Sequence, residues 1–105
     1  MTIEKIIDSY LPAESATDEL AGFFSLFADK TRIKILSVLT IADLCVNDIS
    51  YVLGLTQSTV SHQLRTLKER KIVNCFKMGK RTVYYISNSK IEPFLLQAVL
   101  ATEID

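Results

Sequence analysis

The stretch LGLTQSTVSHQLRTLKERKIVNCFKMGKRTVYYI, residues 53–86, contains a change of hydrophobic period that decides the fold. In its first half, Val60, Leu64 and Leu67 recur at i, i+4 and i+7, which is the spacing of one apolar helix face. In its second half, β-branched and aromatic residues alternate with polar ones on both sides of Gly79, as in two strands joined by a tight turn. We therefore predict a helix followed by a β-hairpin.

A second helix is expected directly before this stretch. The segment from about Val46 to Leu53 is helical in pattern, Gly54 is a typical C-terminal glycine, and Thr56 is a suitable N-cap for the next helix. Two helices joined by a short turn that contains glycine form a helix-turn-helix. The hairpin that follows has Lys77, Lys80 and Arg81 around Gly79, which gives it a basic tip and makes it a wing.

The flanking sequence completes a mainly helical domain. Apolar stripes at helical spacing run through 15–39, and a last amphipathic helix is predicted at 89–103. We predict a mainly α fold with a small β-hairpin, a dimeric winged helix-turn-helix of order α-α-α-α-β-β-α. It is expected to form a single DNA-binding domain over 1–105, with an N-terminal arm or helix at 1–16 and a dimerisation helix at 89–103.

Length and composition favour association between two copies. The 105 residues suit one domain, and 49% of them are hydrophobic, which is high for so short a chain. We expect a helix face to be buried against a second copy, and the alternative is that the last helix packs on its own domain. The residues expected at this interface are Phe23, Phe24, Phe94, Leu95, Ala98 and Val99.

The sequence predicts a cytoplasmic protein without a membrane partner. It contains no run of 18 apolar residues, and its first residues do not follow a signal-peptide pattern. Two cysteines in such a chain do not indicate a disulfide framework.

The charge is concentrated, although the formal net charge is zero. Residues 57–81 contain seven Lys and Arg against the single acid Glu69, a balance of +6, while 1–56 carry −4 and 82–105 carry −2. A local basic block of this kind attracts phosphates. A solvated basic face without a partner is the alternative.

A polar helix start beside a basic wing is typical of proteins that read DNA. The first turns of a recognition helix place side chains on base edges in the major groove, and cations contact the backbone. The predicted DNA-binding residues are Gln57, Ser58, Thr59, Ser61, His62, Arg65, Lys68, Lys80 and Arg81. A winged-helix module that binds another protein, without specific DNA binding, is the alternative.

Neither a phosphate-cradling glycine loop nor a paired-carboxylate site is visible in the sequence, so we predict no enzyme and no cofactor.

The segments ADKTRIKIL, LGLTQSTVSHQLRTL and GKRTVYYI occur in the order and at the spacing of the ArsR/SmtB-type winged-helix repressors, which the chain resembles over roughly 20–102. The resemblance implies a homodimer that binds a partly palindromic double-stranded operator and represses a nearby promoter. It also implies release when a small inducer binds, often a metal ion. A thiol-reactive species is the other inducer considered, because of Cys45.

The metal sites of this family are incomplete in the sequence. Metal-sensing relatives have Leu-Cys-Val-Cys-Asp where this chain has Cys45 followed two residues later by Asn47. The second family site corresponds to Asn88, Lys90, Ala101 and Ile104, and the single histidine, His62, lies elsewhere. We predict no metal site. For Cys45 three interpretations stay open, namely a structural thiol at a helix start, a redox or thiol-reactive sensor, and residual metal binding.

Overall fold

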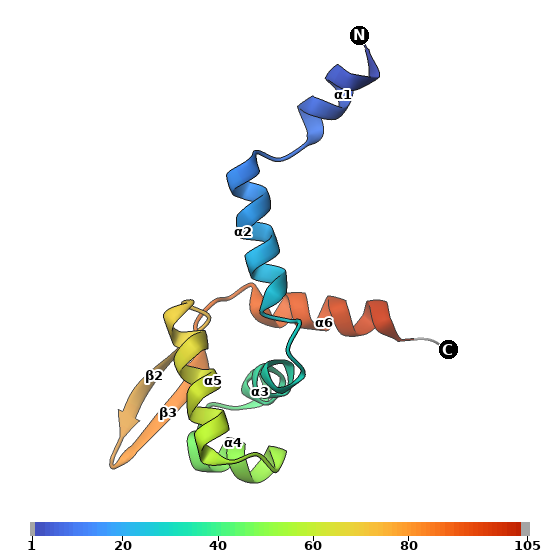
Figure 1. Ribbon diagram of the computed structural model, residues 1–105. Helices are drawn as coiled ribbons and strands as arrows, with labels where there is room; N and C mark the ends of the chain where they lie inside the picture. The colour runs from blue at the N-terminus through green and yellow to red at the C-terminus, as the bar shows by residue number, and fades with distance from the viewer. Residues whose placement is uncertain (1, 104–105) are drawn as a thin grey trace. The chain divides into compact units, whose positions relative to one another are not determined.

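The computed structural model describes residues 2–103, so Ile104 lies outside the described residues. The chain forms two compact units, Met1–Lys30 and Thr31–Asp105, here called the N-terminal unit and the winged unit. The elements are α1 (Ile3–Tyr10), α2 (Glu14–Ser25), α3 (Lys30–Ile41), β1 (Leu44–Cys45), α4 (Val46–Leu53), α5 (Gln57–Glu69), β2 (Val73–Met78), β3 (Arg81–Ile86) and α6 (Ile91–Thr102) (Figure 1).

The N-terminal unit consists of two helices with little buried surface. Thr2 caps α1, because its side-chain oxygen accepts a hydrogen bond from the backbone N–H of Lys5 at 3.4 Å. No residue of α1 is buried. In and just after α2, the ring of Phe23 lies 6.4 Å from that of Phe24 and 5.4 Å from that of Phe27, measured between ring centroids.

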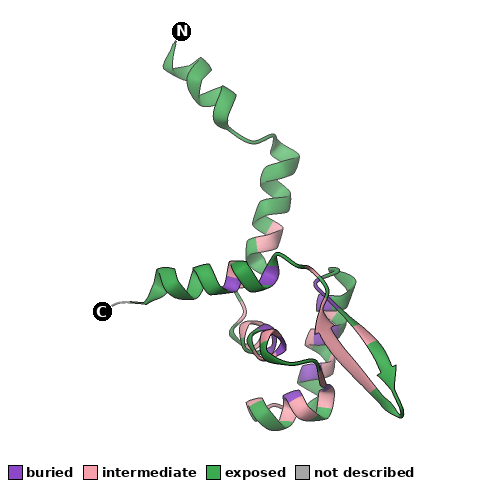
Figure 2. Cartoon of the chain, turned by 180° about the vertical axis from the view of Figure 1, so that it is seen from behind, coloured by how far each residue is buried: buried purple, intermediate pink, exposed green. Residues whose placement is uncertain are grey.

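The winged unit has a contiguous apolar core to which each of its helices and the sheet contribute (Figure 2). The apolar positions of α5 that the sequence places on one face, Val60, Leu64 and Leu67, are completely buried. The other fully buried side chains of this unit are Ile35, Leu36, Ile49, Val73 and Ile91. The helical period of residues 57–69 is therefore the packing face of α5, and its polar residues point elsewhere.

The turn between α4 and α5 is set by two residues. Gly54 ends α4 in the left-handed region at φ 67°, which costs glycine little. Thr56 begins α5, and its hydroxyl oxygen accepts the backbone N–H of Thr59 at 3.1 Å. Both predicted caps are confirmed, and together they fix the helix-turn-helix.

The sheet has the antiparallel order β1-β3-β2. β2 and β3 pair from Val73–Ile86 to Met78–Arg81, so Gly79 and Lys80 alone form the turn at the tip. Gly79 has φ 64°, and a glycine with positive φ at the first central position is typical of a type II′ hairpin. The predicted wing is confirmed.

The predicted element order needs one correction. Within residues 2–103, five helices precede the hairpin rather than four, and a third strand, β1, pairs with β3 through Leu44–Tyr84 and Cys45–Val83. Two residues are too few to show an alternating pattern, so this strand left no signal in the sequence. No helix among the described residues is both long and apolar enough to cross a membrane.

Candidate nucleic-acid interface

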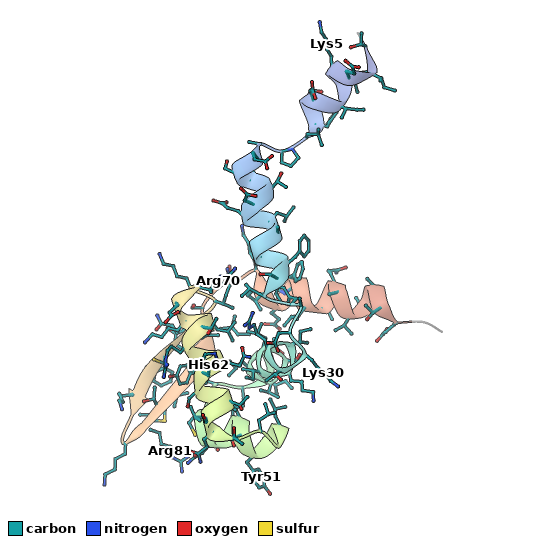
Figure 3. All side chains as sticks on the ribbon, in the orientation of Figure 1. Lys5, Lys30, Tyr51, His62, Arg70 and Arg81 are labelled. Atoms are coloured by element: carbon teal, nitrogen blue, oxygen red, sulfur yellow. The ribbon has the colours of Figure 1, made fainter. Side chains whose placement is uncertain are left out.

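The outward face of α5 is polar from its first residue. Gln57, Ser58, Thr59, His62 and Arg65 are exposed, and Ser61 is half-buried (Figure 3 labels His62). Because the opposite face of the helix is locked into the core, these side chains are presented together to solvent. They offer hydrogen-bond donors and acceptors of the kinds that contact base edges.

One of these side chains also has a structural contact. The Thr56 hydroxyl lies 2.8 Å from the Thr59 hydroxyl and donates to it, while it accepts the backbone N–H of Thr59. The Thr59 hydroxyl can still donate its own hydrogen outward. Thr59 therefore combines helix capping with a position on the polar face.

A link between α3 and α5 was not foreseen from the sequence. The Arg32 guanidinium donates through Nε to Oε1 of Gln63 at 3.0 Å, and this bond is partly buried. It joins residues 31 apart in the chain, so no local pattern could indicate it. The bond helps hold α5 at a fixed orientation on the helix behind it.

The wing carries its predicted cations at the tip. Lys80 and Arg81 are exposed there (Figure 3 labels Arg81). Lys68, at the end of α5, is also exposed, and its ammonium donates to the sulfur of Cys75 on β2 at 3.3 Å. The basic segment 57–81 thus spans α5, β2 and the turn, and concentrates positive charge on these neighbouring elements.

Cys45 is the N-cap residue of α4, as its position in the sequence suggested. Its side chain does not cap the backbone but donates to Oδ2 of Asp48 at 3.1 Å, and it is only 7% exposed. Both Cys45 and Cys75 are free thiols. Over residues 2–103, no group of three His, Cys, Asp or Glu side chains is arranged to hold a metal ion.

The predicted dimerisation residues differ in exposure. Phe24 and Val99 are about half exposed, Ala98 is exposed, and Phe23 and Phe94 are half-buried. Leu95 is buried at 9% exposure and belongs to the core of its own chain. On α6 the exposed large apolar side chains are Leu96, Val99 and Leu100, and Leu96 and Leu100 are not among the predicted dimerisation residues.

Comparison with known proteins identifies the family. The model of bacterial regulatory proteins of the arsR family matches residues 29–75. The regulator NmtR of Mycobacterium tuberculosis is 31% identical over 88 residues, which cover 84% of this chain and 73% of NmtR. The chain belongs to the ArsR family.

Two further likenesses support this membership. The cadmium resistance regulatory protein CadC of Listeria innocua is 40% identical over 76 residues, which cover 71% of this ArsR-family chain and 64% of CadC, less than two thirds of its length. The crystal structure of AntR, an antimony-specific transcriptional repressor, superposes with a TM-score of 0.79 at 26% identity over 87% of this chain and 83% of AntR. The predicted family and the winged helix-turn-helix fold are confirmed, and these relatives are regulators rather than enzymes.

Proposed function

We propose that this ArsR-family protein is a homodimeric transcriptional repressor that binds a specific duplex operator. The observation that carries the proposal is the exposed polar face of α5 beside the cationic tip of the wing, on a helix whose other face is fixed in the core. Gln57, Ser61 and His62 read base edges in this proposal, while Arg65, Lys80 and Arg81 contact the backbone. The names of the relatives, a cadmium resistance regulator and an antimony-specific repressor among them, support repression.

The homodimer is supported by the composition of α6. This helix buries Ile91 and Leu95 in its own chain and yet exposes Leu96, Val99 and Leu100. A helix that is apolar on more than one side is normally covered on more than one side. A second copy of the chain would supply the missing cover and would place two α5 helices on one duplex.

Selection of duplexes from a randomised pool by the purified protein tests the proposal. We expect an inverted repeat to be enriched, with half-sites about one helical turn apart, roughly 34–36 Å. In anisotropy titrations the enriched duplex should bind on the order of 1,000-fold tighter than random DNA at the same salt concentration. A pool that stays unenriched would refute sequence-specific repression and favour the protein-interaction module instead.

We propose that the inducer does not act through a metal ion bound within a single chain. The described residues offer Cys45 with its partner Asp48, but a soft metal ion needs three or four ligands. Release of the enriched duplex should be measured with cadmium, zinc, antimonite and peroxide in turn, on the native protein and on Cys45→Ser. Release by a metal that disappears in Cys45→Ser would contradict this inference, and retention with every metal would support it.

A further inference from the structure

A hollow lies between the start of α4 and the tip of the wing. Its volume is about 210 Å³, and its lining residues are Cys45, Val46, Asn47, Lys80, Arg81 and Thr82. The sheet brings these two segments together, because Cys45 pairs with Val83 across β1 and β3. The chain that runs on from Cys45 into α4 therefore lies beside the residues that precede Val83, and α4 is in contact with β3.

The lining of this hollow is suited to an oxyanion. Lys80 and Arg81 supply two cations, and Thr82 and Asn47 add a hydroxyl and an amide that can donate hydrogen bonds. The nearby carboxylate of Asp48 does not line the hollow, and it already accepts the thiol hydrogen of Cys45. The volume is ample for a phosphate group, since one water takes roughly 30 Å³ of liquid.

The place of the hollow in the fold indicates where that phosphate comes from. α4 and α5 are in contact, and α5 begins at the end of the winged unit where the wing tip and α4 also lie (Figure 1). A duplex read by the first turns of α5 would run across the surface formed by the wing tip and the start of α4, and so over the mouth of the hollow. A backbone phosphodiester is thus the anion that this hollow would meet.

We propose that the hollow seats one backbone phosphate of the bound duplex in each protomer, with Asn47 and Thr82 as donors beside Lys80 and Arg81. This inference rests on the proposed DNA binding and adds α4 to the interface. It also gives Asn47 a role in holding DNA. Phosphate contacts fix the register of the protein on the duplex and carry no direct sequence information.

The test uses the full chain and the duplex enriched by selection. Asn47→Ala and Thr82→Val each remove one donor per protomer. Each should weaken binding by the dimer roughly 30-fold, equally on enriched and random duplexes, because two hydrogen bonds of about 1 kcal/mol are lost per complex. Thr82→Ser keeps the hydroxyl and should bind as the native protein does. Ser87→Ala removes an exposed hydroxyl from the connection between β3 and α6, outside the proposed DNA and dimer surfaces, and is the matched control.

A duplex with a neutral methylphosphonate at one backbone position at a time separates a direct contact from a structural effect. At the position that the hollow seats, the native protein should bind the modified duplex more weakly than the unmodified one. On that modified duplex, Asn47→Ala should bind no more weakly than the native protein, because the contact that the substitution removes is already lost. Losses that add at every position would overturn the inference, as would native affinity in both Asn47→Ala and Thr82→Val. If the native protein enriches no duplex at all, the proposed function itself has failed, which is a different result.

Discussion

At the scale of single residues, the direction of α5 depends on the short connection that leads into it. Gly54 lets the chain turn at positive φ, and Thr56 restarts the helix two residues later. The hydroxyl of Ser50 donates to the carbonyl of Leu55 and closes the same connection from the other side. Val60, four residues after Thr56, is already buried in the core. A different conformation of this connection would therefore displace the polar residues of α5 on both sides of Val60.

Replacement of Gly54 tests this dependence on backbone conformation. A Cβ at Gly54 would meet no atom within 4 Å, so Gly54→Ala should be destabilising through backbone strain alone. We expect a decrease of about 1 kcal/mol in the free energy of unfolding, measured by urea denaturation. Gly54→Asn should cost less, since asparagine tolerates the left-handed region better. Equal stability of Gly54→Ala and the native protein would show that α4 can end in another conformation.

At the scale of elements, the helices and strands that could be predicted are those with a local sequence pattern. The apolar spacing of Val60, Leu64 and Leu67 and the alternation around Gly79 were sufficient for α5 and the wing. The strand β1 was missed because two residues carry no period, and its pairing with β3 is what forms the hollow beside Asn47. Side-chain contacts between different elements, such as Lys68 of α5 with Cys75 of β2, leave no trace in a single sequence.

The bond between α3 and α5 is the clearest element-scale contact of this kind, and a double-mutant cycle measures it. Arg32→Ala, Gln63→Ala and the double variant should show a coupling energy of roughly 1.5–3 kcal/mol, because the donor is charged and the bond is partly buried. Urea denaturation of the four proteins supplies the values. A coupling near zero would mean that core packing alone orients α5 on α3.

The wing should act on affinity rather than on sequence preference. The double variant Lys80→Gln, Arg81→Gln removes two cations per protomer without disturbing the core, since both side chains are exposed. We expect weaker binding to enriched and random duplexes alike and a salt dependence that is shallower by about 4 in log–log slope for the dimer. Gln57→Ala should instead narrow the difference in affinity between the enriched and the random duplex, and it should leave the slope of the salt dependence unchanged.

Lys34→Gln is the matched control for charge, because Lys34 is an exposed lysine on α3, outside the basic segment 57–81. Its slope should equal that of the native protein. A wing variant that keeps the native slope would remove Lys80 and Arg81 from the interface. A wing variant that changes preference between duplexes would mean that the wing reads bases.

At the scale of the whole molecule, the apolar surface that stays exposed supports the proposed dimer. The chain is 49% hydrophobic, and large apolar side chains stay exposed on α6 although its buried residues already face the core. Burial of apolar surface contributes roughly 25 cal/mol per Å², so three such side chains on each protomer give a dimer a substantial driving force. Operator recognition would then depend on association, because one protomer presents a single α5 helix to one groove.

Acidic substitutions on α6 test this dependence. Leu96→Asp and Val99→Asp lie at positions that are 57% and 52% exposed, so the fold of each chain should survive, which thermal melting by circular dichroism checks. We expect the mass measured by light scattering to be that of one chain, because a dimer would bury the two introduced carboxylates without partners. Affinity for the enriched duplex should drop on the order of 100-fold or more, since the second half-site is no longer held by the same molecule.

Ile41→Asp is the control for a charge introduced on exposed apolar surface, because Ile41 is 84% exposed at the end of α3. It should keep the mass of two chains and native affinity. A native protein that has the mass of one chain and still binds an inverted repeat tightly would contradict the dimer. A Leu96→Asp variant that remains dimeric would instead move the interface away from α6, and the exposed aromatic Phe24 on α2 would be the next position to change.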